Sequence, residues 1–200
     1  MNGGLTMEEK YYESQTFENL KLDGEIIENC EFVDCKFINC TFENCKIFKC
    51  SLSECVFYRC SIISLEAEYS HIQFAEFECC NLVGVNWNEL LPVGKLSKPI
   101  SKLLECHLKY NTFTEMTFVK FDFSGSEISD SMFAKCKLTE SNFSKCRLDR
   151  TEFFECDMRN ANFYEALGYK VDIFTSKLKG AKFSFPEVVN LLSGLGIKID

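Results

Sequence analysis

The thirteen cysteines carry the most reactive side chains of this 200-residue sequence. Thiolates bind zinc, form disulfides or act as nucleophiles. Zinc sites pair ligands about two to four residues apart, whereas a long run of these cysteines is spaced five apart. We therefore predict no metal site and no cofactor, and a packing role for the run, which comprises Cys30, Cys35, Cys40, Cys45, Cys50, Cys55 and Cys60.

The cysteines are not expected to form a disulfide scaffold either. Twelve of the thirteen stand two residues before a large apolar residue, a slot that Ser141, Thr151 and Ala161 fill elsewhere, so size explains their presence. The N-terminus has no apolar run typical of a signal peptide, and no stretch is long and apolar enough to span a membrane. We expect a cytoplasmic location with no membrane partner, where thiols stay reduced.

The sequence offers little other catalytic chemistry. His71 and His107, the two histidines, each directly precede a large apolar residue and should point outward. Glycine-rich phosphate loops and the H-E-x-x-H and G-x-S-x-G patterns do not occur. We predict no catalytic residues and no enzyme activity.

The elements that position these side chains follow a period of five. Apolar residues recur every fifth position from Phe17 to Trp87 and again, one residue out of phase, from Leu108 to Phe183. Thirty of these 31 positions are apolar, against roughly fourteen expected from composition, so chance is excluded. Neither a helix nor a flat strand predicts this period. A chain that turns a corner every five residues wraps into coils, which stack through backbone hydrogen bonds at ~4.8 Å.

The repeat resembles that of the pentapeptide-repeat proteins, in which a small residue, a polar residue, Leu or Phe and two polar residues recur. Segments 40–44, 141–145 and 161–165 (CTFEN, SNFSK and ANFYE) fit it closely. The resemblance covers about residues 15–185. It implies an all-β fold, a right-handed quadrilateral parallel β-helix with four pentets per coil and nearly eight coils.

Breaks in the repeat predict the domain organisation. We expect an N-terminal cap or disordered lead over 1–14, repeat tracts over 15–87 and 103–185, and a loop or phase slip over 88–102 that holds two of the three prolines. That loop is either a tolerated insertion or a recognition element. If it binds a partner, its candidate residues are Pro92, Lys95 and Lys98.

The C-terminal segment 186–200 is predicted to be a short helix and tail that caps the last coil. Pro186 suits a first helical position, and apolar residues follow at helical spacing. The segment is similar to the C-terminal module of the branch that contains the Qnr, MfpA and albicidin-resistance proteins, which implies a homodimer. Candidate interface residues are Phe185, Val188, Val189, Leu191, Leu192 and Leu195.

The charge of the chain is acidic and unevenly distributed. The net charge is −8, and all of it falls in residues 1–100, with 16 acids and 8 bases, while residues 101–200 balance at 14 each. Direct nucleic-acid binding is disfavoured by this balance and by the lack of a basic run. Five bases, however, are expected near one wall of the second tract: Lys120, Lys137, Arg159, Lys177 and Lys179.

Two hypotheses for function remain. The branch resemblance implies a DNA mimic that binds a type II topoisomerase (gyrase or topoisomerase IV) and protects it from inhibitors such as quinolones. The alternative is a scaffold that binds an unknown protein partner. In the first case the candidate contact residues are an acidic group close in sequence, Glu66, Glu68, Glu76 and Glu78, which could equally be a solvated coil face.

Overall fold

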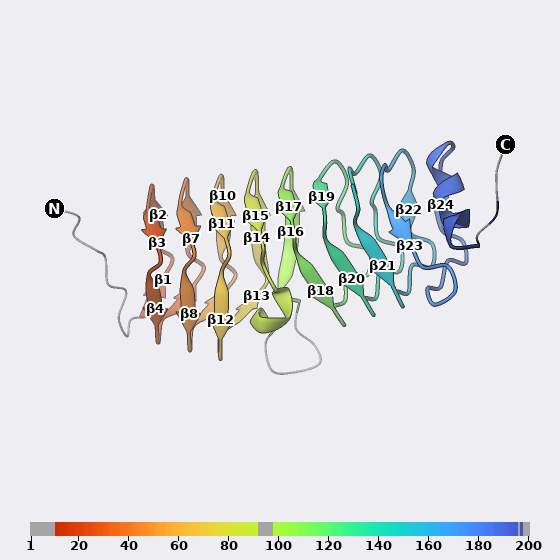
Figure 1. The fold of residues 1–200 in the computed structure, drawn as a ribbon. Helices are drawn as coiled ribbons and strands as arrows, with labels where there is room; N and C mark the ends of the chain where they lie inside the picture. Colours follow the sequence, from red (N-terminus) through yellow and green to blue (C-terminus); the bar gives the residue numbers. More distant parts are fainter. Residues whose placement is uncertain (1–10, 92–97, 196, 198–200) are drawn as a thin grey trace. The chain divides into compact units, whose positions relative to one another are not determined.

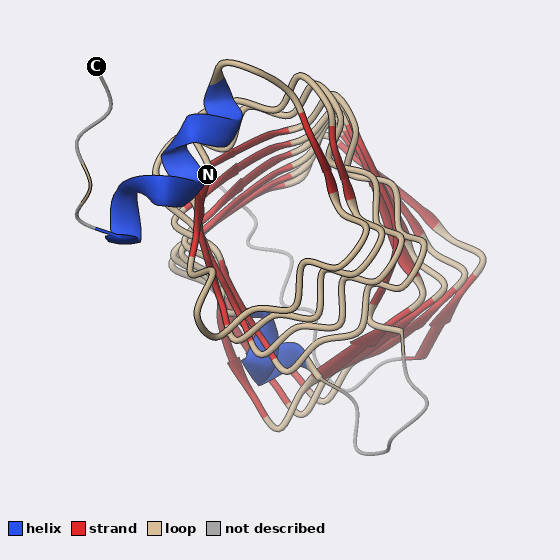
Figure 2. Ribbon diagram, turned by 90° about the vertical axis from the view of Figure 1, so that its right-hand side faces the viewer, coloured by secondary structure: helices blue, strands red, loops and turns tan. Residues whose placement is uncertain are grey.

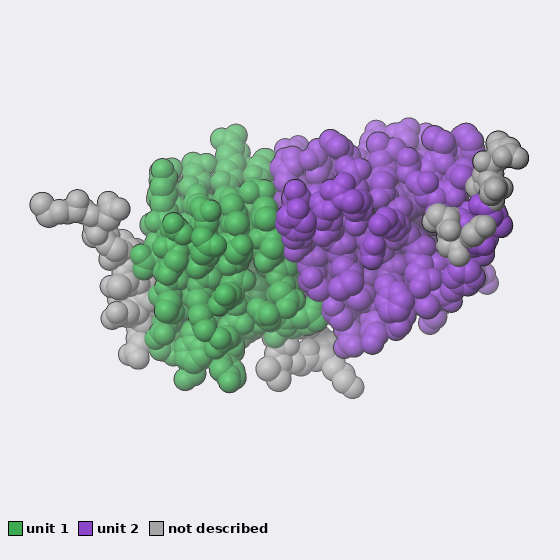
Figure 3. Space-filling model, in the orientation of Figure 1, with its two compact units in different colours: residues 1–102 green, residues 103–200 purple. Residues whose placement is uncertain are grey.

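The computed structural model describes residues 11–91, 98–195 and 197. These residues divide into two compact units, unit 1 (residues 1–102) and unit 2 (residues 103–200) (Figure 3). Each unit is a parallel β-solenoid, and together the units contribute about eight turns with very little helix. The sequence prediction of a pentapeptide-type solenoid is confirmed.

Unit 1 has four walls of stacked strands, each strand three or four residues long (Figures 1 and 2). The β1 wall contains β1 (Tyr11–Glu13), β5 (Glu31–Val33), β9 (Ser51–Ser53) and β13 (His71–Gln73). The β2 wall contains β2 (Thr16–Glu18), β6 (Lys36–Ile38), β10 (Val56–Tyr58) and β14 (Ala75–Glu78). The β3 wall contains β3 (Lys21–Asp23), β7 (Thr41–Glu43), β11 (Ser61–Ile63) and β15 (Asn81–Val83). The β4 wall contains β4 (Ile26–Glu28), β8 (Lys46–Phe48) and β12 (Glu66–Glu68).

Unit 2 repeats this plan with shorter strands. The β17 wall contains β17 (His107–Lys109) and β19 (Glu127–Ser129) and continues through single bridges to Arg147 and Leu167. The β18 wall contains β18 (Thr112–Thr114), β20 (Met132–Ala134), β21 (Glu152–Phe154) and β23 (Lys170–Val171). The β22 wall joins Asp122 and Asn142 by bridges to β22 (Asn162–Phe163), which pairs with β24 (Lys182–Phe183). The fourth wall consists only of the bridges Thr117↔Lys137, Lys137↔Asp157 and Asp157↔Lys177.

The corners between walls share one backbone conformation, although they hold many residue types. The second residue after each central apolar residue is usually left-handed, as at Asn39 (φ 52°). There its N–H points along the stack and donates to the carbonyl of Tyr58 in the next coil at 3.0 Å. The backbone strain of the corner is therefore offset by a ladder hydrogen bond in nearly every pentet.

The structure differs from the sequence prediction at the N-terminal end of the repeat and at one register position within unit 2. The first strand begins at Tyr11, inside the expected N-terminal lead, because Tyr12 continues the apolar phase and stacks on Phe32 at 5.0 Å. In unit 2 the partner of Phe153 is Val171, not the expected Ile173, because the pentet after Gly168 is shortened and the chain then turns outward. Gly168 itself has φ +76°, and a Cβ there would lie 2.9 Å from the Cα of Asp149.

The predicted loop and C-terminal module are partly described. The 3₁₀ helix η1 (Trp87–Leu90) follows β15, with Asn86 accepting a hydrogen bond from the N–H of Asn88, and β16 (Ile100–Leu104) resumes the coil. Residues 92–97 lie outside the described residues. The C-terminal element is the 3₁₀ helix η2 (Glu187–Leu195). No helix among the described residues has the length and apolarity needed to span a membrane.

Candidate protein-interaction surfaces

The cysteines lie inside the coils. All thirteen cysteines are reduced thiols; twelve of them are buried, and Cys79 is half-buried. The Cys60 thiol donates to the carbonyl of Phe37 at 3.2 Å, a contact with the preceding coil that recurs along the stack. Burial raises the pKa of Cys55 and of Cys146 to about 12, so both thiols stay protonated at neutral pH. Their geometry therefore supports the predicted packing role, and within the described chain no three or more His, Cys, Asp or Glu side chains gather as a metal site would require.

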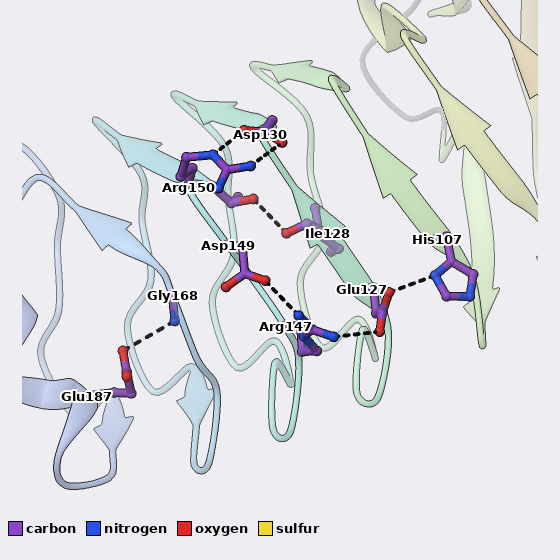
Figure 4. A network of polar contacts seen from close by, with 10 residues as sticks. His107, Glu127, Ile128, Asp130, Arg147, Asp149, Arg150, Gly168 and Glu187 are labelled. Atoms are coloured by element: carbon purple, nitrogen blue, oxygen red, sulfur yellow. Dashed lines mark hydrogen bonds and ion pairs between the residues drawn. The ribbon is translucent and has the colours of Figure 1, made fainter.

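The two histidines are exposed on outer faces, as predicted. His71 begins β13, and the Nδ1 atom of His107 lies 2.9 Å from the Glu127 carboxylate. Glu127 also pairs with Arg147 at 3.3 Å, and Arg147 pairs with Asp149 at 3.2 Å (Figure 4). These contacts form a surface ion-pair ladder without a nucleophile beside a base. Exposed pairs of this kind each contribute about 0–1 kcal/mol.

A shallow groove of about 460 Å³ lies beside this ladder in unit 2. Tyr110 and Met132 line it together with two ion pairs, Arg150 with Asp130 and Lys170 with Glu152. The Arg150 guanidinium lowers the pKa of Asp130, whose side chain is only 16% exposed. The charges of the groove are thus largely paired internally.

The four acidic residues grouped by sequence do not lie on one surface. Glu66 and Glu68 lie on β12 of the β4 wall, whereas Glu76 and Glu78 lie on β14 of the β2 wall. Each pentet moves the chain to the next wall, so residues ten apart fall on opposite walls. Two of the four carboxylates are also paired, Glu68 with Lys46 and Glu78 with Lys102 at 3.0 Å.

The acidic surface of unit 1 is instead the β1 wall. Its outward side chains include four exposed carboxylates, and its four segments, 11–14, 31–34, 51–54 and 71–74, contain no lysine or arginine. No ion pair recorded among the described residues involves these carboxylates. The Asp34 carboxylate accepts a hydrogen bond from the Ser14 hydroxyl at 2.9 Å. The four are Glu13, Glu31, Asp34 and Glu54.

Sequence reasoning missed this wall because its acids are up to 41 residues apart. Stacked residues differ by twenty, as the register Phe32↔Leu52 shows. Grouping charged residues by position within a twenty-residue coil would have collected Glu13, Asp34 and Glu54 on one side. Neighbours in sequence are the wrong guide to neighbours on a solenoid surface.

Of the three predicted loop residues, the structure describes Lys98. Pro92 and Lys95 lie outside the described residues. Lys98 is exposed, and its carbonyl accepts the N–H of Phe74 at 2.7 Å. Partner binding by these three residues stays a prediction.

The predicted dimer residues divide between a half-buried and an exposed set. Val188, Val189 and Leu191 are half-buried. The helix η2 is tied to the last coil by the Glu187 carboxylate, which accepts the N–H of Gly168 at 3.2 Å (Figure 4). Solvent reaches the other apolar side chains, Phe185 (81% exposed), Leu192 (37%) and Leu195 (44%).

Comparison with known proteins agrees with this architecture. Residues 106–183 match the family model described as a pentapeptide repeat region. The repeat in this segment is therefore of the pentapeptide type. No curated protein matches it in sequence.

Solved pentapeptide-repeat structures share the fold at low sequence identity. Two trypsin-treated variants of QnrB1, a plasmid-mediated fluoroquinolone resistance protein, align over 95% of this chain and 97% of theirs, with 16% identity and TM-scores of 0.60 and 0.61. HetL from the cyanobacterium Nostoc sp. strain PCC 7120, a protein involved in heterocyst differentiation regulation, aligns over 88% of this chain and 86% of its own, with 16% identity and a TM-score of 0.52.

Proposed function

We propose that this protein is a non-enzymatic binding protein that uses its β1 wall to occupy a DNA-binding surface of a type II topoisomerase. The observation that carries the proposal is the wall of four exposed carboxylates without lysine or arginine. Carboxylates on successive coils, such as Asp34 and Glu54, recur at a rise of ~4.8 Å and form a regular row of negative charge, with a wider spacing than the ~3.4 Å of phosphates along a DNA strand.

The fold supports the same proposal. QnrB1, whose fold this chain shares, is a fluoroquinolone resistance protein, and fluoroquinolones are quinolone drugs that act on gyrase and topoisomerase IV. An acidic wall is drawn to a basic DNA channel by the same field that attracts DNA. Binding there would protect the enzyme from a quinolone by competing with the DNA that the drug requires.

A supercoiling assay with the host's own gyrase tests the proposal. Purified protein is added at low salt with and without a quinolone, and DNA supercoiling is measured. We expect supercoiling to change with protein concentration and the effect to weaken as salt screens the carboxylates. If neither gyrase nor topoisomerase IV responds or binds at low salt, the alternative holds, and the solenoid is a scaffold for a different protein.

We also propose that two chains pair through the C-terminal module. The exposed apolar side chains of Phe185, Leu192 and Leu195 support this proposal, because large apolar side chains left in solvent within one short segment are typical of an interaction surface. Light scattering should give about twice the chain mass of 23.1 kDa. The double substitution Leu192→Glu with Leu195→Glu should yield monomers, whereas Ile26→Glu, an exposed site in unit 1, should not. A wild-type monomer at micromolar concentration would contradict the proposal.

A further inference from the structure

The fourth wall of unit 2 gathers basic side chains that are far apart in sequence. We call it the basic wall, residues 117–120, 137–140, 157–160 and 177–180. Lys137, Asp157 and Lys177 stand in one register row, joined by the bridges Lys137↔Asp157 and Asp157↔Lys177. In the row two residues along, Arg159 and Lys179 lie on successive coils. The bridges confirm the predicted grouping for Lys137 and Lys177.

The charge of this wall is positive after its internal pairs are counted. It carries five bases and two acids. The Arg159 guanidinium holds the Asp157 carboxylate at 2.6 and 2.7 Å and lowers its pKa. Lys120 pairs with Glu140 at 3.6 Å. Lys137, Lys177 and Lys179 are exposed, and no ion pair recorded within the described part of the chain uses their ammonium groups.

The three unpaired lysines set this wall apart from the β17 wall opposite it and from the adjacent β18 wall. The β17 wall pairs most of its charges internally through Arg147 and Arg150 (Figure 4). The β18 wall carries more acids than bases. The excess positive charge of unit 2 is therefore concentrated on one face, although the unit as a whole is nearly neutral.

The chemistry of the face selects one class of partner. Protein interfaces rely on aromatic or other large anchors, and Val119 is the one large apolar side chain exposed on the described basic wall. Single-stranded nucleic acid needs exposed aromatic rings for base stacking, which this wall lacks in its described residues. A row of lysines on a rigid sheet, without pockets or rings, suits the evenly charged backbone of a duplex.

We infer that the basic wall binds the phosphate backbone of duplex nucleic acid without sequence preference. The acidic overall charge argued against such a partner at the level of sequence, but charges further away than ~8 Å are screened at physiological ionic strength. The local charge of the basic wall, rather than the net charge of the chain, therefore determines the attraction of phosphates. The inference is independent of topoisomerase binding, since it concerns a different unit and a different wall.

Fluorescence anisotropy with a labelled 20-base-pair DNA duplex tests the inference on the full chain. Wild-type protein should bind at low salt, with log K falling against log salt at a slope of about −3, as expected when three lysines displace counterions. The triple substitution Lys137→Glu, Lys177→Glu and Lys179→Glu should weaken binding at least tenfold and bring the slope near zero. All three positions are exposed, so circular dichroism should stay unchanged.

A matched control distinguishes an effect of the basic wall from an effect of net charge alone. Lys21→Glu, Lys36→Glu and Lys49→Glu change three exposed lysines in unit 1 and shift the net charge equally. This control should retain most of the duplex affinity. Equal loss in both triple variants, or no duplex binding at low salt, would overturn the inference. Binding of poly-glutamate in preference to the duplex would also overturn it, in favour of an acidic protein partner.

Discussion

In unit 2 two ladders of phenylalanines face each other across the coil, whereas unit 1 has one. On the β22 wall Phe123, Phe143 and Phe163 stack at 4.5 and 4.8 Å, and Phe143 also meets Phe133 and Phe153 of the β18 wall edge to face. In unit 1 the ladder Phe17, Phe37, Phe57 and Phe77 on the β2 wall is opposed by Ile27, Ile47 and Ala67 on the β4 wall.

The difference leaves space in unit 1. An apolar cavity of about 60 Å³ lies in this unit, lined by residues that include Leu52, Ile62, Leu65 and Trp87, and no polar atom is exposed to it. Leu52 is a central residue of β9, yet it is not fully buried. The same repeat pattern therefore permits a tightly filled and a less tightly filled interior, because aliphatic side chains reach less far toward the coil axis than phenyl rings.

The largest expected effect comes from removing a ring where two ladders meet. Phe143→Ala should cost about 5 kcal/mol of unfolding free energy, because four rings lose a neighbour. Phe42→Ala in unit 1 should cost about 3 kcal/mol, since Phe42 already borders the cavity and has one aromatic neighbour, Phe37 at 5.8 Å. Urea unfolding followed by circular dichroism measures both. Equal costs would contradict the packing difference.

Two buried thiols, one in each unit, should behave alike and so serve as a common reference. Cys55 in unit 1 and Cys146 in unit 2 have pKa values raised to about 12, against ~8.5 in an unfolded chain. A raised pKa favours the protonated folded state, so its contribution to stability is complete below about pH 8.5 and is lost as the pH rises toward 12.

We therefore expect the urea midpoint to hold up to pH 8 and to fall progressively above it. At pH 8 most thiols should react slowly with a thiol reagent in folded protein, and all thirteen should react quickly in denaturant. Cys45→Ala should cost little, because alanine occupies the same slot at Ala161. Rapid labelling of most thiols in folded protein would contradict their burial.

Filling the cavity should stabilise unit 1 modestly. Leu52→Phe places a ring in register with Phe32 and into the void, and should add about 0.5–1 kcal/mol. The matched change in unit 2, Leu148→Phe, adds a ring where the coil is already packed and should cost about 1–3 kcal/mol. Thermal unfolding of the two variants should shift in opposite directions. A stabilised Leu148→Phe would show that unit 2 also has unfilled space.

The smallest effect is expected on the surface. Arg150→Met removes an exposed partner of Asp130, and such a pair contributes about 0–1 kcal/mol. The urea midpoint at pH 7 should change only slightly. A loss above 2 kcal/mol would mean that the ladder of Figure 4 is structural rather than a solvated face.

The sequence predicted the interior better than the surface. Central residues such as Phe57 and slot residues such as Cys60 were assigned correctly, because burial imposes the five-residue period directly. One register position inside unit 2 was harder to assign, since the pairing of Phe153 with Val171 depends on a local turn at Gly168. The acidic β1 wall could not be found from neighbouring residues, because surface proximity follows the twenty-residue coil.

The central claim is that the β1 wall, and not the acids that are close in sequence, makes the contact with a topoisomerase. Two charge-reversed variants with the same net charge test it by equilibrium binding to the host's gyrase. One carries lysine at Glu13, Glu31, Asp34 and Glu54, the other at Glu66, Glu68, Glu76 and Glu78. We predict at least a tenfold loss of affinity for the first variant and a loss of less than threefold for the second. An equal loss, or a greater loss in the second variant, would contradict the account.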